Sequence, residues 1–193
     1  MKKIALGAQG SVPVLPAMPV LLVGAMVDGK PNFITVAWTG VACAEPLMLA
    51  VAIRHSRHTL RGIEQHGTFS VNVPSADLVK EVDFCGIASG ATVDKVAACG
   101  FRVFFGTLPD APLIEQCPVN VECRVHTKLD LGSHILVVGQ VEECHVSASC
   151  LTDGKPDVEK IDPLLYASPG REYRRLGAAL AQAFSVGKEI KQR

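Results

Sequence analysis

The sequence predicts an antiparallel β-barrel with peripheral α-helices, a mainly β fold in a single domain over residues 1–193. Three observations predict it: many short β-type runs separated by turn residues, few and short helical patterns, and no βαβ rhythm. Hydrophobic residues make up 48% of the chain and the mean hydropathy is +0.27, so the chain has enough apolar side chains to form a sizeable core. Nineteen Lys and Arg balance nineteen Asp and Glu, so the net charge disfavours nucleic acid as a partner.

The N-terminal part of the chain predicts a β-hairpin followed by a third strand. Residues 20–27 and 32–39 flank Asp28-Gly29, a dipeptide that supplies the positive φ angles of a tight turn. Residues 47–53 are apolar almost throughout, which predicts a strand that is covered on both faces.

The spacing of the apolar residues then changes from that of a strand to that of a helix. One short helix is expected before the next strand and one after it. We expect Ser56 to cap the first helix, which ends at His66-Gly67. Residues 68–73 have strand character, and Ser75 is expected to cap the second helix.

The middle of the chain predicts a loop and then a long β-ribbon. Glycines and serines interrupt any period over residues 85–100, where only 94–98 can form a short helix. Residues 101–105 resume strand character. Residues 119–129 and 134–146 then form two long alternating runs, which predict an antiparallel pair.

The C-terminal part predicts a loop and a final helix. Residues 151–170 are rich in Gly and Pro and leave room for at most one short strand. Leu176, Leu180 and Phe184 follow at helical spacing, which predicts an amphipathic helix over about 171–190.

The termini and the cysteines predict a soluble, cytoplasmic protein without a membrane partner. Polar residues 9–11 interrupt the N-terminal apolar run before a signal peptide can form, and the apolar run 18–27 is too short to cross a bilayer. The seven cysteines are odd in number and include no CxxC pair. That pattern favours free thiols over disulfides, and we expect no metal site.

Three segments carry more polar and special residues than core packing requires. The strand 31–40 has small residues through which a flat ligand can reach the backbone; the alternative is an ordinary strand with Trp38 as a core anchor. Residues 54–59 combine two Arg, two hydroxyls and a helix start, which favours a phosphate site as much as a solvated helix cap. The Gly-rich loop 85–90, with 94–95 after it, can cradle an anion or the polar edge of a heterocycle.

Catalytic residues are not expected from the motifs. Ser89 does not lie in a GxSxG sequence, and no paired carboxylates or hydrolase triad can be identified. The chain also has neither a GxGxxG dinucleotide fingerprint nor a P-loop.

Several short segments, taken in order along most of the chain, carry a family pattern. They are Asn32-Phe33-Ile34-Thr35-Val36-Ala37-Trp38, Glu45-Pro46, Arg57-His58-Thr59, Phe69-Ser70-Val71-Asn72-Val73-Pro74, Cys85-Gly86, Ser89-Gly90, Asp94-Lys95, Asn120-Val121-Glu122-Cys123, Gly132-Ser133-His134 and Val138-Gly139-Gln140-Val141. In this order and spacing the sequence resembles the flavin reductase-like, FMN-binding split-barrel family, and within it the flavoredoxin-like proteins.

The resemblance implies a homodimer of split barrels that binds FMN at or near the subunit interface. It implies that the ring lies against the backbone of Thr35, Val36 and Ala37, with Trp38 nearby. It assigns the phosphate to Arg54, Ser56, Arg57 and Thr59, the ring or ribityl chain to Ser89, Gly90 and Lys95, and further cofactor contacts to Asn32 and His134. Many relatives have Gly-Asp-His where this chain has Gly132-Ser133-His134, a change that removes a carboxylate anchor for the histidine.

The function that the resemblance implies is electron transfer through bound FMN, as an oxidoreductase of flavoredoxin or flavin reductase type. NAD(P)H or a redox protein would be the electron donor. Two alternatives stay open: an NAD(P)H:flavin reductase for which flavin is an exchangeable substrate, and a non-enzymatic FMN-binding module. FMN is expected in preference to FAD because the proposed anion site ends on one phosphate and the dinucleotide fingerprint is missing.

Overall fold

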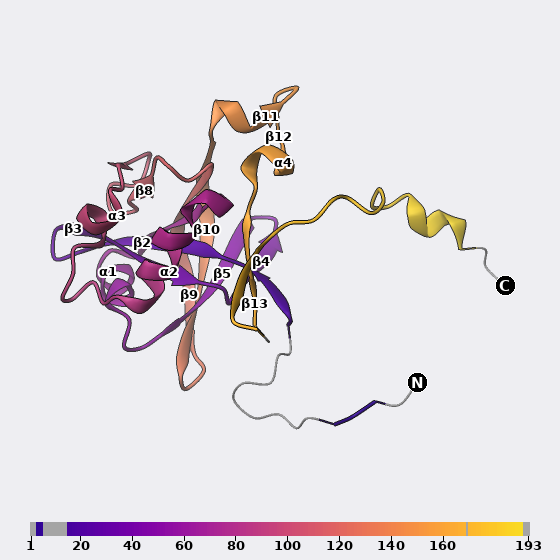
Figure 1. The fold of residues 1–193 in the computed structure, drawn as a ribbon. Helices are drawn as coiled ribbons and strands as arrows, with labels where there is room; N and C mark the ends of the chain where they lie inside the picture. The colour runs from indigo at the N-terminus through magenta and orange to yellow at the C-terminus, as the bar shows by residue number, and fades with distance from the viewer. Residues whose placement is uncertain (1–2, 6–14, 169, 191–193) are drawn as a thin grey trace.

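An antiparallel seven-stranded sheet that curls into a barrel forms the body of the molecule (Figure 1). The structure is a computed structural model that describes residues 3–5, 15–168 and 170–190. The strand order in the sheet is β3-β2-β6-β9-β10-β5-β4. The strands are β2 (Leu21–Val27), β3 (Lys30–Val36), β4 (Thr39–Ala44), β5 (Leu47–Arg54), β6 (Thr68–Val73), β9 (Val119–Asp130) and β10 (His134–Val146).

The predicted hairpin and long ribbon are both confirmed. Asp28 and Gly29 connect β2 to β3 with φ angles of 50° and 76°, the conformation that this turn requires. β9 and β10 pair along most of their length, with two register shifts that bend the ribbon.

The chain passes from β3 directly to the other end of the sheet. The Ala52 N–H donates to the carbonyl oxygen of Trp38 at 2.9 Å, which extends the pairing of β4 with β5 to the residue before β4. The strand that follows Trp38, β4, is the last strand of the sheet and was not predicted. β4 lies on the surface and lacks the alternation of buried and exposed residues that identifies a half-buried strand in sequence.

Three helices pack on strands of the barrel: α1 (His58–His66), α2 (Val79–Ile87) and α3 (Lys95–Cys99), with the 3₁₀ turn η1 (Ala76–Leu78) leading into α2. A further 3₁₀ turn, η2 (Ala148–Cys150), packs on α4 (Val158–Ile161). α1 packs closely on β2, because a Cβ at Gly62 would meet the carbonyl oxygen of Met26 at 2.1 Å. The predicted caps were wrong: α1 begins after Arg57 rather than Ser56, and Ser75 precedes a 3₁₀ turn without a side-chain cap bond.

The core has two parts, one inside the barrel and one beneath the helices. β2 separates them, because Val23 faces the barrel interior and Leu22 faces the second cluster. Phe33 and Val82 in the second cluster join β3 to α2. Both faces of β2 are therefore covered, which explains its nearly continuous apolar sequence.

A second, three-stranded sheet lies beside the barrel and is more regular than the sequence predicted. It has the order β1-β13-β14, formed by β1 (Ala17–Pro19), β13 (Leu164–Ala167) and β14 (Glu172–Arg175). Two further pairs are β7 (Val103–Phe104) with β8 (Leu113–Ile114) and β11 (Leu151–Thr152) with β12 (Lys155–Pro156). The segment 151–170 thus holds more than the one short strand expected.

The predicted C-terminal helix was wrong. After β14 the chain leaves the body as an extended arm, and its one helical turn is η3 (Val186–Glu189) (Figure 1). Leu180 and Phe184 are fully exposed there, with relative accessibilities of 101% and 97%. An amphipathic helix takes most of its stability from packing its apolar face, and here that face has no surface of its own chain beneath it. None of the helices in the described ranges is long and apolar enough to span a membrane.

Candidate functional site

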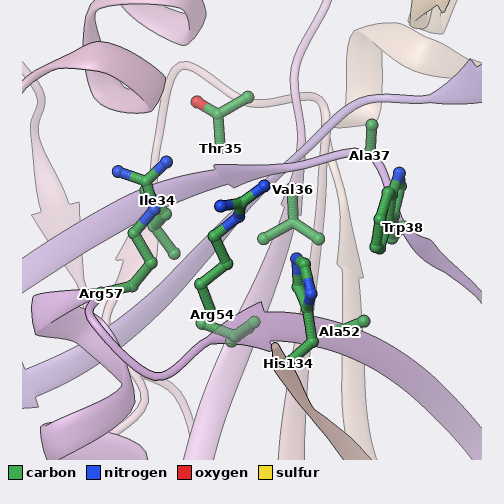
Figure 2. A pocket seen from close by; sticks show the side chains of 10 residues that line it. Ile34, Thr35, Val36, Ala37, Trp38, Ala52, Arg54, Arg57 and His134 are labelled. Carbon is green, nitrogen blue, oxygen red and sulfur yellow. The ribbon is translucent and has the colours of Figure 1, made fainter. Parts of the chain in front are cut away.

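A cavity of about 190 Å³ opens between the end of β3 and the connection from β5 to α1 (Figure 2). Its walls bring together seven of the residues that the sequence assigned to a cofactor. The lining residues are Ile34, Thr35, Val36, Ala37, Trp38, Ala52, Ile53, Arg54, Arg57 and His134.

This cavity is positively charged. Arg54 and Arg57 extend their guanidinium groups toward β3 (Figure 2). Among the described residues, neither arginine forms an ion pair with a carboxylate, and the cavity lining contains no acidic residue. Two uncompensated cations that converge on one cavity favour an anionic ligand there.

His134 is held between a strand partner and an aromatic ring. The register of β10 on β5 places His134 opposite Arg54, and its ring lies 4.5 Å from that of Trp38 with a 31° tilt. Burial lowers the pKa of His134 below its ordinary value, and the nearby charges of Arg54 and Arg57 lower it further. The imidazole therefore stays neutral at physiological pH.

The serine in Gly132-Ser133-His134 anchors the histidine that was expected to lose its anchor. Ser133 Oγ and His134 Nδ1 are 2.8 Å apart, so a hydroxyl takes the place of the expected carboxylate. The carboxylate of Asp130, at the end of β9, instead accepts hydrogen bonds from Gly132 N–H and from His55.

Thr35 presents only its backbone to the cavity. Its hydroxyl donates to the carbonyl oxygen of Val82 in α2, on the opposite face of β3 from Val36 (Figure 2). Because β3 is the first strand of the sheet order, the backbone groups on its outer edge have no ladder partner. The strand can therefore offer a ligand N–H and C=O groups, as expected, but not the threonine hydroxyl.

A second cavity, of about 870 Å³, holds three more of the predicted residues, Asn32, Gly90 and Lys95. Lys95 is 3% exposed and donates to the carbonyl oxygens of Phe33 and Cys85, both at 2.8 Å. Burial lowers its pKa below the ordinary value. Gly90 lies directly against Asn32, since a Cβ at Gly90 would be 1.9 Å from Asn32 Oδ1.

Three predicted residues line neither cavity. Thr59 is buried and its hydroxyl accepts a hydrogen bond from the Asn32 side chain at 2.7 Å. Ser56 is exposed before α1, and the Ser89 hydroxyl accepts from Ala91 N–H within its own loop. Arg57 and His58 are consecutive, so the two cavities adjoin at the start of α1.

The sequence reasoning missed several lining residues. Ile34 and Ala52 line the smaller cavity, and Lys30, His58 and Arg61 line the larger one. His58 and Arg61 are spaced three residues apart on α1, so a basic face of that helix was the available signal. The described residues include no group of three or more His, Cys, Asp or Glu arranged to hold a metal ion.

Comparison with known proteins finds a matching family and several similar solved structures. The family model described as Flavin reductase like domain matches residues 16–177. The crystal structure of flavoredoxin from Methanosarcina acetivorans is 38% identical, has a TM-score of 0.92, and covers 98% of this chain and 99% of its own. Flavoredoxin of Desulfovibrio vulgaris (Miyazaki F) is 36% identical with a TM-score of 0.88, covering 97% and 100%. An FMN-binding protein from Thermus thermophilus is 25% identical with a TM-score of 0.80, covering 93% and 100%.

Proposed function

Because the chain belongs to the flavin reductase-like domain family, we propose that it binds FMN and transfers electrons through it as an oxidoreductase of flavoredoxin type. The observation that carries the proposal is the smaller cavity, where Arg54 and Arg57 lie beside the outer edge of β3, and where, within the described ranges, neither arginine meets a carboxylate and that edge pairs with no strand. An anionic phosphate attached to a flat, hydrogen-bonding ring matches both features. The similar flavoredoxins and the FMN-binding protein support FMN as that ligand.

The residues of the cavity fit the two ends of the cofactor. Arg57, at the start of α1, and Arg54 would hold the phosphate, since one guanidinium group can donate two parallel hydrogen bonds to two phosphate oxygens. The backbone of Thr35, Val36 and Ala37 would hold the polar edge of the ring. Asn32, Gly90 and Lys95, which line the larger cavity, complete the proposed cofactor set together with Ser56, Thr59 and Ser89, which lie outside both linings.

The protein's own part in the reaction is binding, orientation and exclusion of water. FMN, when bound, supplies the electron chemistry, so no catalytic side chain is required. The Trp38 and His134 rings lie in contact, and the Ser133 hydroxyl is hydrogen-bonded to the histidine, so these side chains orient one another at this wall of the cavity. The neutral His134 leaves Arg54 and Arg57 as the charges that select an anion.

The setting of this function is part of the proposal. We place the protein in the cytoplasm, since all seven cysteines are free thiols, as expected in a reducing compartment. NAD(P)H or a redox protein would supply electrons. A homodimer would shield the flavin from water better than a single subunit whose smaller cavity is open on one side.

The decisive experiment compares FMN with riboflavin, which lacks the phosphate. Arg57→Ala should weaken FMN binding by about 1.5–3 kcal/mol and leave riboflavin affinity almost unchanged, as expected for a charge-assisted hydrogen bond. Arg61→Ala is the matched control: it removes the same charge from the helix that Arg57 precedes, but Arg61 faces the larger cavity and pairs with Asp28. Isothermal titration of the flavin-free wild type and both variants with FMN and with riboflavin measures all six affinities.

The outcomes separate the alternatives. Equal losses for FMN and riboflavin in the Arg57 variant would contradict the phosphate contact, and a phosphate-specific loss in the Arg61 variant would move the phosphate to the larger cavity. If the wild type does not bind FMN, the proposed function fails. Rapid loss of FMN on dilution together with steady NAD(P)H oxidation would identify an exchangeable flavin substrate instead of a bound cofactor. Tight FMN with no reduction by any donor would leave a binding module.

A further inference from the structure

The C-terminal arm is an apolar segment that packs on none of the other residues that the structure describes. Residues 176–190 follow β14 and run away from the body (Figure 1). Leu180 and Phe184 are fully exposed, and Leu176, Val186 and Ile190 are 50%, 50% and 80% exposed. A soluble chain seldom exposes so many large apolar side chains on one short segment unless they meet another surface.

The body of the same chain has an apolar edge that is also without a partner. β4, the last strand of the barrel sheet, has the sequence Thr-Gly-Val-Ala-Cys-Ala and carries no charged residue. Val41 on this strand is 71% exposed, and Leu47 and Trp38 beside it are 47% and 54% exposed. Edge strands are usually protected by charges, prolines or a covering segment, so an uncharged edge indicates that something covers it.

We infer that the arm of one chain packs on the β4 edge of a second copy, and that the exchange is reciprocal. The inference rests on the homodimer of the proposed function and names what holds it together. One chain carries both surfaces, and its arm is directed away from its body, so it cannot cover its own β4 edge with the arm in this conformation (Figure 1). A two-fold axis lets each arm reach the partner's edge and closes the assembly at two subunits.

Two further observations favour a second copy over an unrelated partner. The solved flavoredoxin from M. acetivorans matches 98% of this chain, so the match extends into the arm. The arm is therefore a feature shared with a relative rather than a tail peculiar to this chain. The arm is also firmly attached at its base. Tyr173 in β14 donates to Asp83 at 3.0 Å, and Arg175 forms ion pairs with Asp77 and Asp162. A fixed base sets the direction in which the arm leaves, as a symmetric exchange requires.

The test is the dimer dissociation constant of the full-length chain, measured by analytical ultracentrifugation without added flavin. Leu180→Asp with Phe184→Asp should raise that constant roughly 100-fold or more, because two buried apolar side chains per arm are lost and charges are introduced. The control is Gln182→Asp with Ser185→Asp, which adds the same charge to the same arm and should leave the constant within about threefold of wild type. Circular dichroism checks that each variant keeps the barrel.

Mixing two defective variants tests the reciprocal contact directly. Val41→Lys should also weaken the dimer, because it places a charge on the β4 edge. A mixture of the arm variant with Val41→Lys retains one intact contact, an arm from one chain on an unaltered edge of the other. The mixed dimer should therefore form at lower concentration than either variant alone.

Three results would overturn the inference. An arm variant that dimerises like the wild type would show that the arm is not in the interface, and loss of dimer in Val41→Lys alone would then indicate direct pairing of two β4 edges. A mixture no stronger than its components would exclude an arm-to-edge contact. A wild type that stays monomeric would reject both the arm exchange and the homodimer, while the FMN titrations would still decide the cofactor.

Discussion

Gly90 is the residue at which a single added methyl group should disturb the candidate site. A Cβ there would lie 1.9 Å from Asn32 Oδ1, and the Asn32 side chain is itself held by a hydrogen bond that it donates to the Thr59 hydroxyl. Gly90→Ala must therefore displace the asparagine amide or the loop. We expect a loss of about 1–3 kcal/mol in the free energy of unfolding, the usual effect of overpacking, and weaker FMN binding.

The urea midpoint of unfolding measures the first effect of Gly90→Ala, and a flavin titration measures the second. Gly40→Ala is the matched control, because a Cβ at Gly40 meets nothing within 4 Å and its φ is not positive. An alanine at position 90 that is tolerated as well as one at position 40 would show that the Gly90 loop moves freely away from Asn32.

His134 offers a prediction of pH dependence. Its pKa is lowered by burial and by the positive charges of Arg54, His55 and Arg57, so its imidazolium form appears only below the ordinary range. Removing one of those charges should favour protonation. Arg54→Gln should therefore raise the pKa of His134, whereas Arg61→Gln, whose charge does not contribute to the shift, should leave it unchanged.

The titration of the His134 ring protons by NMR measures both variants. The register that pairs His134 with Arg54 across β10 and β5 is the structural reason for the coupling. An unchanged or lower pKa in Arg54→Gln would show that the charge of Arg54 does not contribute to the shift.

At the scale of elements, the sequence was reliable where a local signal and the tertiary structure agree. Asp28-Gly29 forms its turn, residues 68–73 are a strand, and Gly67 ends α1 in the left-handed conformation. The short helix expected over 94–98 is α3, and Asp94 stands at its N-cap, where its side chain accepts from Ala97 N–H at 3.0 Å. Each of these features depends on residues within a few positions of one another.

The elements that failed depend on contacts that a single sequence does not reveal. Leu176, Leu180 and Phe184 have helical spacing, yet the arm has no surface of its own chain on which to pack a helix. β4 exposes both faces and shows no alternation, so its pairing with β5 could not be read from the pattern.

Only part of the candidate site was predicted, because the rest also depends on contacts that a single sequence does not reveal. The backbone of Thr35 faces the cavity as expected, but packing of α2 on β3 directs its hydroxyl to Val82.

Glu122 was not singled out as a charged group, although it is fully buried. Burial would raise its pKa, but hydrogen bonds from His145 and from the N–H groups of Leu108 and Thr107 lower it below the ordinary value. Long-range pairing of this kind has no signature in local spacing.

At the scale of the whole molecule, the site depends on the sheet being curled, because its residues come from strands that are distant in the sequence. Trp38 and Ala52 are joined by a hydrogen bond that extends the pairing of β4 with β5, and both line the smaller cavity. Arg54 and His134 come from two neighbouring strands of the same sheet. Unfolding of the barrel therefore disperses the site, so a ligand bound there must stabilise the fold as a whole.

That coupling predicts the effect of FMN on thermal unfolding. A ligand that binds only the folded chain, present at 100 times its dissociation constant, adds about 2.7 kcal/mol to the free energy of unfolding. For a chain of this size that gain corresponds to a rise in Tm of about 5–10 °C. Differential scanning calorimetry should show this rise with FMN, and a smaller one with riboflavin at the same concentration. The Arg57→Ala variant should bring the rise with FMN closer to that with riboflavin, because one of the two proposed guanidinium contacts to the phosphate is then lost. A Tm that does not change at an FMN concentration shown by titration to saturate the protein would mean that FMN also binds the unfolded chain, and that the folded barrel does not create the site.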